Sequence, residues 1–191
     1  MTIPAPDSPA RQHRPTREPV RDRRQFGVAR GMGLALVVVL STLMIAWSLA
    51  PVLSPTDRMI RAAAAVTVVA LWLAAAIGHV AMLRFESAAD IDAAAGGGGD
   101  SPRVAIGNAV LRNTLEQAVL AIPAYVALAW VVEGSGAMIP ALAGLFSVGR
   151  MLFWANYARG AAARAFGFAL TFYASVAALL IVLLALVARL V

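Results

Sequence analysis

The chain has 191 residues, of which 61% are hydrophobic and only 14% charged, and its formal net charge is +6. Because a soluble domain carries roughly 25% charged residues, this composition excludes an ordinary soluble protein and indicates an integral membrane protein. The sequence contains no cysteine, which excludes disulfides, a thiol nucleophile and a thiolate metal site. The two histidines lie far apart with no metal-ligand spacing, so we expect no metal site.

Residues 1–30 form a segment rich in proline and arginine. Its seven arginines outnumber its three acidic residues, and it has too few apolar residues to build a core, so we expect a disordered cytoplasmic tail. We favour a topology determinant that touches anionic lipid headgroups. A nucleic-acid-binding tail is the less favoured alternative, and no nucleic-acid partner is expected.

Five apolar stretches reach the length of about 20 residues that a transmembrane helix needs. They are residues 31–53, 59–83, 107–132, 138–158 and 164–190. Lipid does not tolerate unpaired backbone polar groups, so the spans should be helices. The first is too long for the apolar core of a cleaved signal peptide and is predicted to be a retained anchor. Residues 84–106, which include four consecutive glycines, are expected to be a flexible loop. The predicted fold class is therefore all-α, an integral membrane helical bundle.

The distribution of arginine predicts the orientation, because arginine is enriched on the cytoplasmic side. With the amino terminus in the cytoplasm, only three arginines fall on the other side of the membrane: Arg58, Arg61 and Arg189. We therefore expect a cytoplasmic amino terminus and a periplasmic carboxyl terminus. The use of arginine without lysine is typical of a GC-rich bacterial genome, so the expected location is a bacterial inner membrane.

A first set of polar residues interrupts the third span at Arg112, Asn113, Glu116 and Gln117. Positions three and four apart share roughly one face of a helix, and ionisable groups inside a membrane normally mark a working site. Glu116 can accept from an amine, and Asn113 can both donate and accept. The set is suited to a small peptide-like ligand. The alternative is a purely structural polar contact between packed helices.

A second polar set follows at Arg150, Tyr157 and Arg164, which repeat every seven residues with Phe153 between the first two. If one helix ran through them, they would share one seam. An arginine near a thiol favours the thiolate. The alternative is that each arginine extends to lipid phosphate, and Arg159, which points elsewhere, is expected to do so.

The two polar sets together resemble the MAPEG family, the membrane-associated proteins in eicosanoid and glutathione metabolism. The resemblance rests on Asn113-x-x-Glu116, followed by Arg150-x6-Tyr157-x-Arg159-x4-Arg164, and the wording RNTLEQ resembles bacterial members. It covers residues from about 59 to 190, so that helices two to five correspond to the four helices of the family. The first helix and the tail would be additions.

The resemblance implies a homotrimer that binds glutathione between neighbouring subunits near the cytoplasmic face. Asn113, Glu116 and Tyr157 match glutathione-contacting positions, and Arg164 matches the arginine that stabilises the glutathione thiolate. Arg150 and Arg159 match further motif positions. Four positions depart from the family pattern. Ala109 and Phe153 stand where an arginine and a tyrosine are common, Gln117 replaces an aromatic residue, and Asn156 replaces a common glycine. Arg112 is the candidate substitute for the missing arginine.

Three functions are compatible with these observations. The leading one is a glutathione-dependent membrane transferase or peroxidase acting on lipophilic electrophiles or lipid hydroperoxides, with Arg164 as the catalytic residue. The second is a non-catalytic member that binds a lipid or protein partner in the groove between subunits. The third is a transporter or channel component with Arg112 and Glu116 in the permeation path, although the sequence has no inverted repeat to support it.

Overall fold

The computed structural model describes residues 19–94 and 99–191. Within these residues the chain forms helices and turns without any strand, which confirms the predicted all-α class. The α-helices are α1 (Pro19–Ser48), α2 (Pro55–Phe85), α3 (Ala88–Ala94), α4 (Pro102–Val131), α5 (Met138–Asn156) and α6 (Ala161–Val187). Two short 3₁₀ turns, η1 (Glu133–Gly136) and η2 (Tyr157–Arg159), lie before and after α5.

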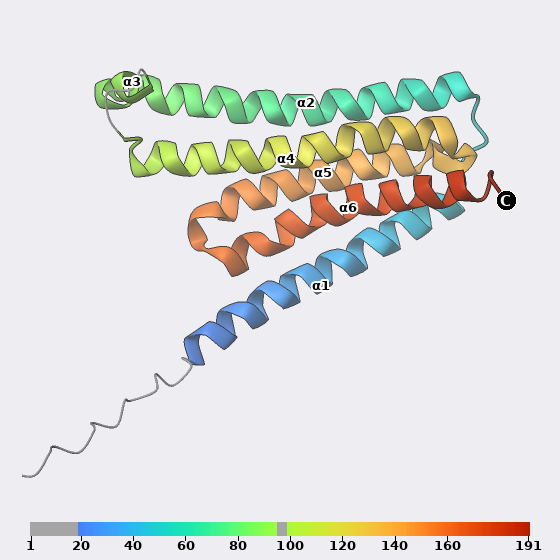
Figure 1. The fold of residues 1–191 in the computed structure, drawn as a ribbon, viewed down its shortest axis with the longest axis horizontal. Helices are drawn as coiled ribbons and strands as arrows, with labels where there is room; N and C mark the ends of the chain where they lie inside the picture. Colours follow the sequence, from blue (N-terminus) through green and yellow to red (C-terminus); the bar gives the residue numbers. More distant parts are fainter. Residues whose placement is uncertain (1–18, 95–98) are drawn as a thin grey trace, which may run out of the picture.

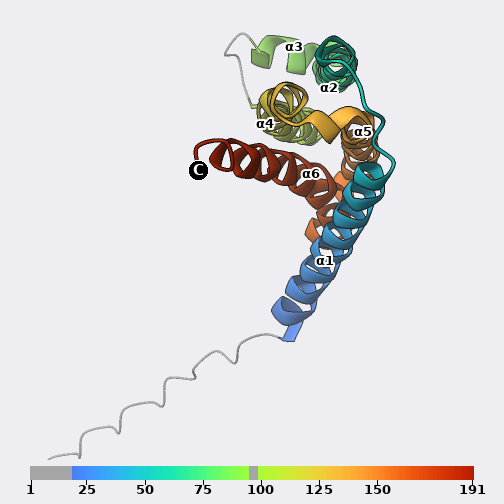
Figure 2. The same ribbon diagram turned by 90° about the vertical axis from the view of Figure 1, so that its right-hand side faces the viewer.

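Helices α2, α4, α5 and α6 run side by side along the long axis of the molecule, and α1 packs on α6 and along α5 (Figure 1). The view turned by 90° places α1 at the opposite edge of the bundle from α2 (Figure 2). One end of the bundle, called here the α5–α6 end, carries α3, the start of α4 and the α5–α6 turn. The other end, called the α4–α5 end, carries the α1–α2 link, η1 and the carboxyl terminus.

Five of the helices in the described residues are long and apolar enough to cross a membrane. Two of them start with a sequence that favours a helix start. α2 and α4 each begin with a Ser-Pro pair, in which Ser54 or Ser101 caps the helix and proline occupies its first turn. The serine hydroxyl accepts from a backbone N–H three residues on, and proline there loses no hydrogen bond. These caps explain why α2 and α4 begin several residues before the predicted 59 and 107.

Helix α1 differs most from the sequence prediction. Residues 19–30 were assigned to the disordered tail, and this is wrong, because the helix already begins at Pro19. Arginine and glutamine are good helix formers, and the helix packs on α6 from Gly27 onward, so it runs beyond its apolar part. It ends at Ser48 rather than at residue 53, since Pro51 disfavours helical geometry in the residue before it. Residues 1–18 lie outside the described part of the chain.

The structure also differs from the prediction that residues 84–106 form a flexible loop. Phe85 ends α2, α3 occupies Ala88–Ala94, and α4 begins at Pro102, so much of the segment is helical. Of the four glycines, Gly96, Gly97 and Gly98 lie outside the described residues. The helical part is held by polar contacts described below.

Two glycines bring α5 and α6 into backbone contact. A Cβ atom at Gly149 would lie 2.6 Å from the Thr171 Cγ2 atom and 2.9 Å from the Gly167 carbonyl oxygen. One at Gly167 would lie 2.5 Å from the Phe153 backbone nitrogen. Small residues allow such close approach of membrane helices, and here they bring the Arg150 region of α5 against α6.

Candidate functional site

Two adjoining cavities open at the α5–α6 end of the bundle, and they share Asn113 and Tyr157. The larger has a volume of about 760 Å³ and is called the polar cavity. The smaller has a volume of about 350 Å³ and is called the apolar cavity. Both volumes fall in the range of about 300–1,000 Å³ found for small-molecule sites.

The polar cavity lies against the outer face of α4. Its lining includes four of the residues predicted to bind a ligand: Arg112, Asn113, Glu116 and Tyr157. The rest of the lining is Asp100, Ala105, Asn108, Ala109, Leu111 and Leu115. The cavity therefore combines a cation, carboxylates and amides, which is a donor and acceptor set for a zwitterionic ligand.

Within this cavity the Asn113 Nδ2 atom donates to Glu116 Oε2 at 3.3 Å. Arg112 and Glu116 are exposed, and neither makes an ion pair with another of the described residues. Gln117, which was expected to extend this face, is instead buried, and its Oε1 atom has no hydrogen-bond partner within the described part of the chain. The helical phase turns Gln117 toward the bundle and Arg112 away from it.

The apolar cavity contains Arg164, the residue predicted to be catalytic. Its lining consists of Val28, Met32, Asn113, Phe153, Tyr157, Ala161, Arg164, Ala165 and Phe168. Only Asn113, Tyr157 and Arg164 among these carry polar side-chain atoms. The cavity therefore offers an apolar wall opposite one cation.

The predicted seam through Arg150, Tyr157 and Arg164 required a continuous helix, and the structure contradicts it. α5 ends at Asn156, and the chain reverses through η2 and Gly160, whose φ of +100° is a conformation that residues other than glycine rarely adopt. The hairpin still brings the Arg164 guanidinium to 4.3 Å from the centre of the Tyr157 ring. The two residues meet across a turn rather than along one helix face.

Arg150 lies behind the cavities and lines neither of them. It is only 1% exposed, and it donates to Asn113 Oδ1 at 2.8 Å and to Thr171 Oγ1 at 2.6 Å. Its guanidinium also lies 4.7 Å from the centre of the Phe153 ring. Arg150 thus does not extend to lipid, and it contacts the site only through other side chains. It fixes the amide of Asn113 so that the nitrogen faces Glu116.

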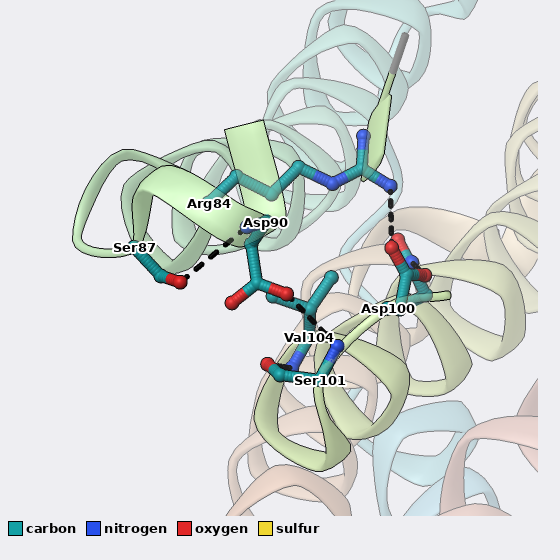
Figure 3. A network of polar contacts seen from close by, with 7 residues as sticks. Arg84, Ser87, Asp90, Asp100, Ser101 and Val104 are labelled. Carbon is teal, nitrogen blue, oxygen red and sulfur yellow. Dashed lines mark hydrogen bonds and ion pairs between the residues drawn. The ribbon is translucent and has the colours of Figure 1, made fainter. Parts of the chain in front are cut away.

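A polar network holds the rim of the polar cavity (Figure 3). Asp100, which lines the cavity, accepts from Asn108 at 2.6 Å and pairs with Arg84 at 3.5 Å. The buried Asp90 of α3 accepts from the backbone N–H of Ser101 at 2.8 Å. This backbone hydrogen bond holds the pKa of the Asp90 carboxyl below its ordinary value. The network ties α3 to the start of α4 beside the cavity.

Sequence reasoning missed several lining residues. Asn108 lies four residues before Arg112 and so shares its helix face, a spacing that could have identified it. Thr171 accepts a hydrogen bond from Arg150. Its only indication in the sequence is the pair Gly149 and Gly167, two small residues that allow α5 and α6 to approach closely beside it. Val28 and Met32 carry no local signal, because apolar residues are common in any span. Arg159 is exposed, bonds to Asn156 at 3.1 Å and lines neither cavity, as expected for a residue pointing elsewhere.

Comparison with curated proteins and with solved structures gave no match. The MAPEG family model, in contrast, matches residues 62–185. This match begins inside α2 and continues through α4, α5 and η2 to near the end of α6, the segment that holds every predicted site residue. The four-helix bundle, the polar residues at its α5–α6 end and the family match agree, and the chain belongs to the MAPEG family.

Proposed function

We propose that the protein is a glutathione-dependent membrane transferase or peroxidase that acts on lipophilic electrophiles or lipid hydroperoxides. The observation that carries the proposal is the pair of adjoining cavities, one polar and one apolar, with Asn113 and Tyr157 at their junction and Arg164 in the apolar one. A reaction between a charged peptide and a lipophilic molecule needs two such environments in contact.

The polar cavity suits glutathione, a tripeptide with two carboxylates and one ammonium group. Arg112 would pair with a carboxylate, since a guanidinium recognises it in two-point geometry. Glu116 would accept from the ammonium, and Asn113, whose amide is oriented by Arg150, would bond the peptide backbone. Ala109 leaves its part of the wall uncharged, so Arg112 is the cation that α4 supplies there.

Glutathione would supply the nucleophilic sulfur, which a protein without cysteine lacks. Arg164 would stabilise the thiolate by its charge and lower the pKa of the thiol. Tyr157 would hold the Arg164 guanidinium through the contact of 4.3 Å between that group and its ring. The mostly apolar lining would strengthen the interaction between the cation and the thiolate.

The proposal includes a homotrimer in a bacterial inner membrane, with a cytoplasmic amino terminus and the site near the cytoplasmic face. On the outer face of α4, Arg112 and Glu116 are exposed beside Leu115, which is 47% exposed, and Val119, which is 62% exposed. Charged side chains in a span are costly when lipid covers them. A neighbouring subunit packed on this face would remove them from lipid and complete the polar cavity.

The proposal is tested by titrating glutathione into the purified protein in detergent while following thiolate absorbance, with Arg164→Ala in parallel. We expect a saturable signal in the wild type that disappears in the variant. Glutathione affinity is measured separately by calorimetry, and the trimer by light scattering. An intact trimer with no heat of binding and no thiolate signal would reject the enzyme and favour the non-catalytic lipid- or partner-binding member of the family. Ligand flux in liposomes would favour the transporter.

A further inference from the structure

Helix α1 lies entirely outside the part of the chain that matches the family, which begins at Ala62. It nevertheless contributes two residues, Val28 and Met32, to the lining of the cavity that holds Arg164. They are four residues apart and therefore lie on one face of α1. The additional helix is thus part of the site and not only an anchor.

Close packing fixes this part of α1 against the start of α6. A Cβ atom at Gly27 would lie 3.0 Å from the Ala162 Cβ atom. One at Gly31 would lie 3.2 Å from the backbone nitrogen of Phe166 and 3.4 Å from the Ala165 Cβ atom. These glycines alternate with Val28 and Met32 along the same two turns. The contact that brings the two helices together therefore also directs Val28 and Met32 toward Arg164.

We propose that Val28 and Met32 determine which electrophiles the enzyme accepts, by forming the α1 wall of an acceptor subsite beside Arg164. The inference rests on the proposed function and adds a specificity element that the four family helices do not supply. The occupant is an electrophile with a polar oxygen facing Arg164 and an apolar chain packed between α1 and α6, against Val28, Met32 and Phe168.

The dimensions of the cavity limit this chain. Its volume is about 350 Å³, a little more than twice the roughly 150 Å³ that accommodates one benzene ring. Electrophiles with chains of medium length should fit. A larger side chain on the α1 wall should reduce the cavity volume and exclude the longer chains first. Met32 is flexible and fills irregular space, so its replacement changes the cavity with little strain on the rest of α1.

The experiment uses the full-length trimer in lipid nanodiscs with 2-alkenals of increasing chain length. In this conjugate addition the glutathione sulfur bonds to the β-carbon, the π electron pair moves to the α-carbon, and that carbon takes a proton, so the thiol adds across the double bond without a leaving group. kcat/KM is measured for the wild type, Met32→Trp and Met32→Ala. The matched control is Met44→Trp, because Met44 lies on the same helix but is 73% exposed, away from the cavity.

For Met32→Trp we expect kcat/KM to fall about 10-fold or more for the long alkenals, the size of effect that one or two methylene groups have in an apolar pocket. The kcat/KM for the shortest alkenal and the affinity for glutathione should be almost unchanged. Met32→Ala should shift the preference toward longer chains, and Met44→Trp should behave as the wild type. If Met32→Trp and Met44→Trp give the same chain-length profile while the wild type turns over, the inference is overturned and the proposed function stands.

A second measurement tests the position of α1 without any activity. The chain has no cysteine, so Gly31→Cys combined with Ala165→Cys introduces the only two thiols. Their Cβ atoms would be about 3.4 Å apart, close to the spacing of about 3.5–4.5 Å in disulfides, and mild oxidation should join them. Gly33→Cys with Ala165→Cys is the control, because nothing lies within 4 Å of a Cβ atom at Gly33.

Failure of the first pair to cross-link above the control would place α1 elsewhere and overturn the inference, whatever the activity. If the double variant cross-links while the wild type binds no glutathione, the proposed function is rejected instead, and the acceptor role of Met32 with it. Cross-linking together with the chain-length shift supports both.

Discussion

The two ends of the bundle use arginine in opposite ways. At the α4–α5 end, three arginines donate to backbone carbonyl oxygens: Arg58 to Ala129 at 3.0 Å, Arg189 to Val131 at 2.6 Å and Arg61 to Gly136 at 2.7 Å. Two of these acceptors belong to the last turn of α4, where carbonyl groups have no partner within the helix. These arginines satisfy backbone carbonyl groups.

At the α5–α6 end, Arg112 and Arg164 line the two cavities of the candidate site. At the other end Arg61 also lines a cavity, of about 290 Å³, but the rest of that lining is apolar and Arg61 donates to a backbone carbonyl. Arg150 is intermediate, since it is buried like a structural residue but bonds a cavity residue. The two ends therefore differ in what their arginines meet: backbone carbonyl groups at one end, and the lining of the two candidate cavities at the other. Substitutions at one end should therefore change stability, and those at the other should change binding and catalysis.

The largest effect is expected for turnover in Arg164→Ala. Removing the charge beside the thiolate should lower kcat by about 100- to 1,000-fold, as loss of an oriented donor does in other enzymes. The unfolding midpoint in detergent should remain near that of the wild type. Arg61→Ala is the matched variant from the other end and should keep its activity. Equal losses in the two variants would contradict the distinction between the ends.

Arg58→Ala should lower the stability of the protein and leave its turnover unchanged. Arg58 is buried, and its loss leaves the carbonyl groups of Ala129 and Leu53 without a donor. We expect the free energy of unfolding to fall by about 1.5–3 kcal/mol, the value of hydrogen bonds to a charged group. Denaturant titration in detergent measures it, with Thr67→Ala, an exposed residue bonded only within its own helix, as the control. Lower turnover per folded molecule in Arg58→Ala would argue against a structural role.

Arg150→Met tests the intermediate case. The variant frees Asn113 Oδ1 and lets the amide rotate away from Glu116, so KM for glutathione should rise about 10-fold, equivalent to one hydrogen bond of about 1.4 kcal/mol. kcat should change much less, because Arg164 keeps its place. Arg150→Lys should restore part of the affinity. A fall in kcat with KM unchanged would mean that Arg150 acts on the reaction itself.

The smallest effect concerns the rim. The pKa of the Asp90 carboxyl is lowered in the folded protein. The stabilisation that the ionised carboxyl provides is therefore fully present above its ordinary pKa of 3.8, and it is lost as the pH falls through the lowered pKa. Asp90→Asn should remove this dependence and increase hydrogen exchange at the Ser101 amide. The midpoint of global unfolding should hardly move. Unchanged protection of Ser101 in the variant would show that the contact is not needed to hold α3.

The helices were predicted well where they depend on local sequence, and less well at their ends. The apolar stretch 138–158 corresponds to α5 within two residues, because its length and hydropathy determine it. The start of α1 was missed by twelve residues, since Pro19 begins a polar helical extension that meets α6 only from Gly27 onward. The helix at Ala88–Ala94 was also missed, and part of its stability comes from contacts between Asp90 and Ser101 across the loop.

The sequence by itself determined the membrane class, the five spans and the family, because span length, hydropathy and motif spacing are local properties of the chain. Only the tertiary structure decided that Arg150 turns inward, that a hairpin places Arg164 on Tyr157, and that α1 forms a wall of the cavity. These features depend on how closely helices approach, and glycines such as Gly31 and Gly149 control that approach through residues distant in sequence. Helical spacing gives the face on which a side chain lies, but the neighbouring helix determines what that face meets.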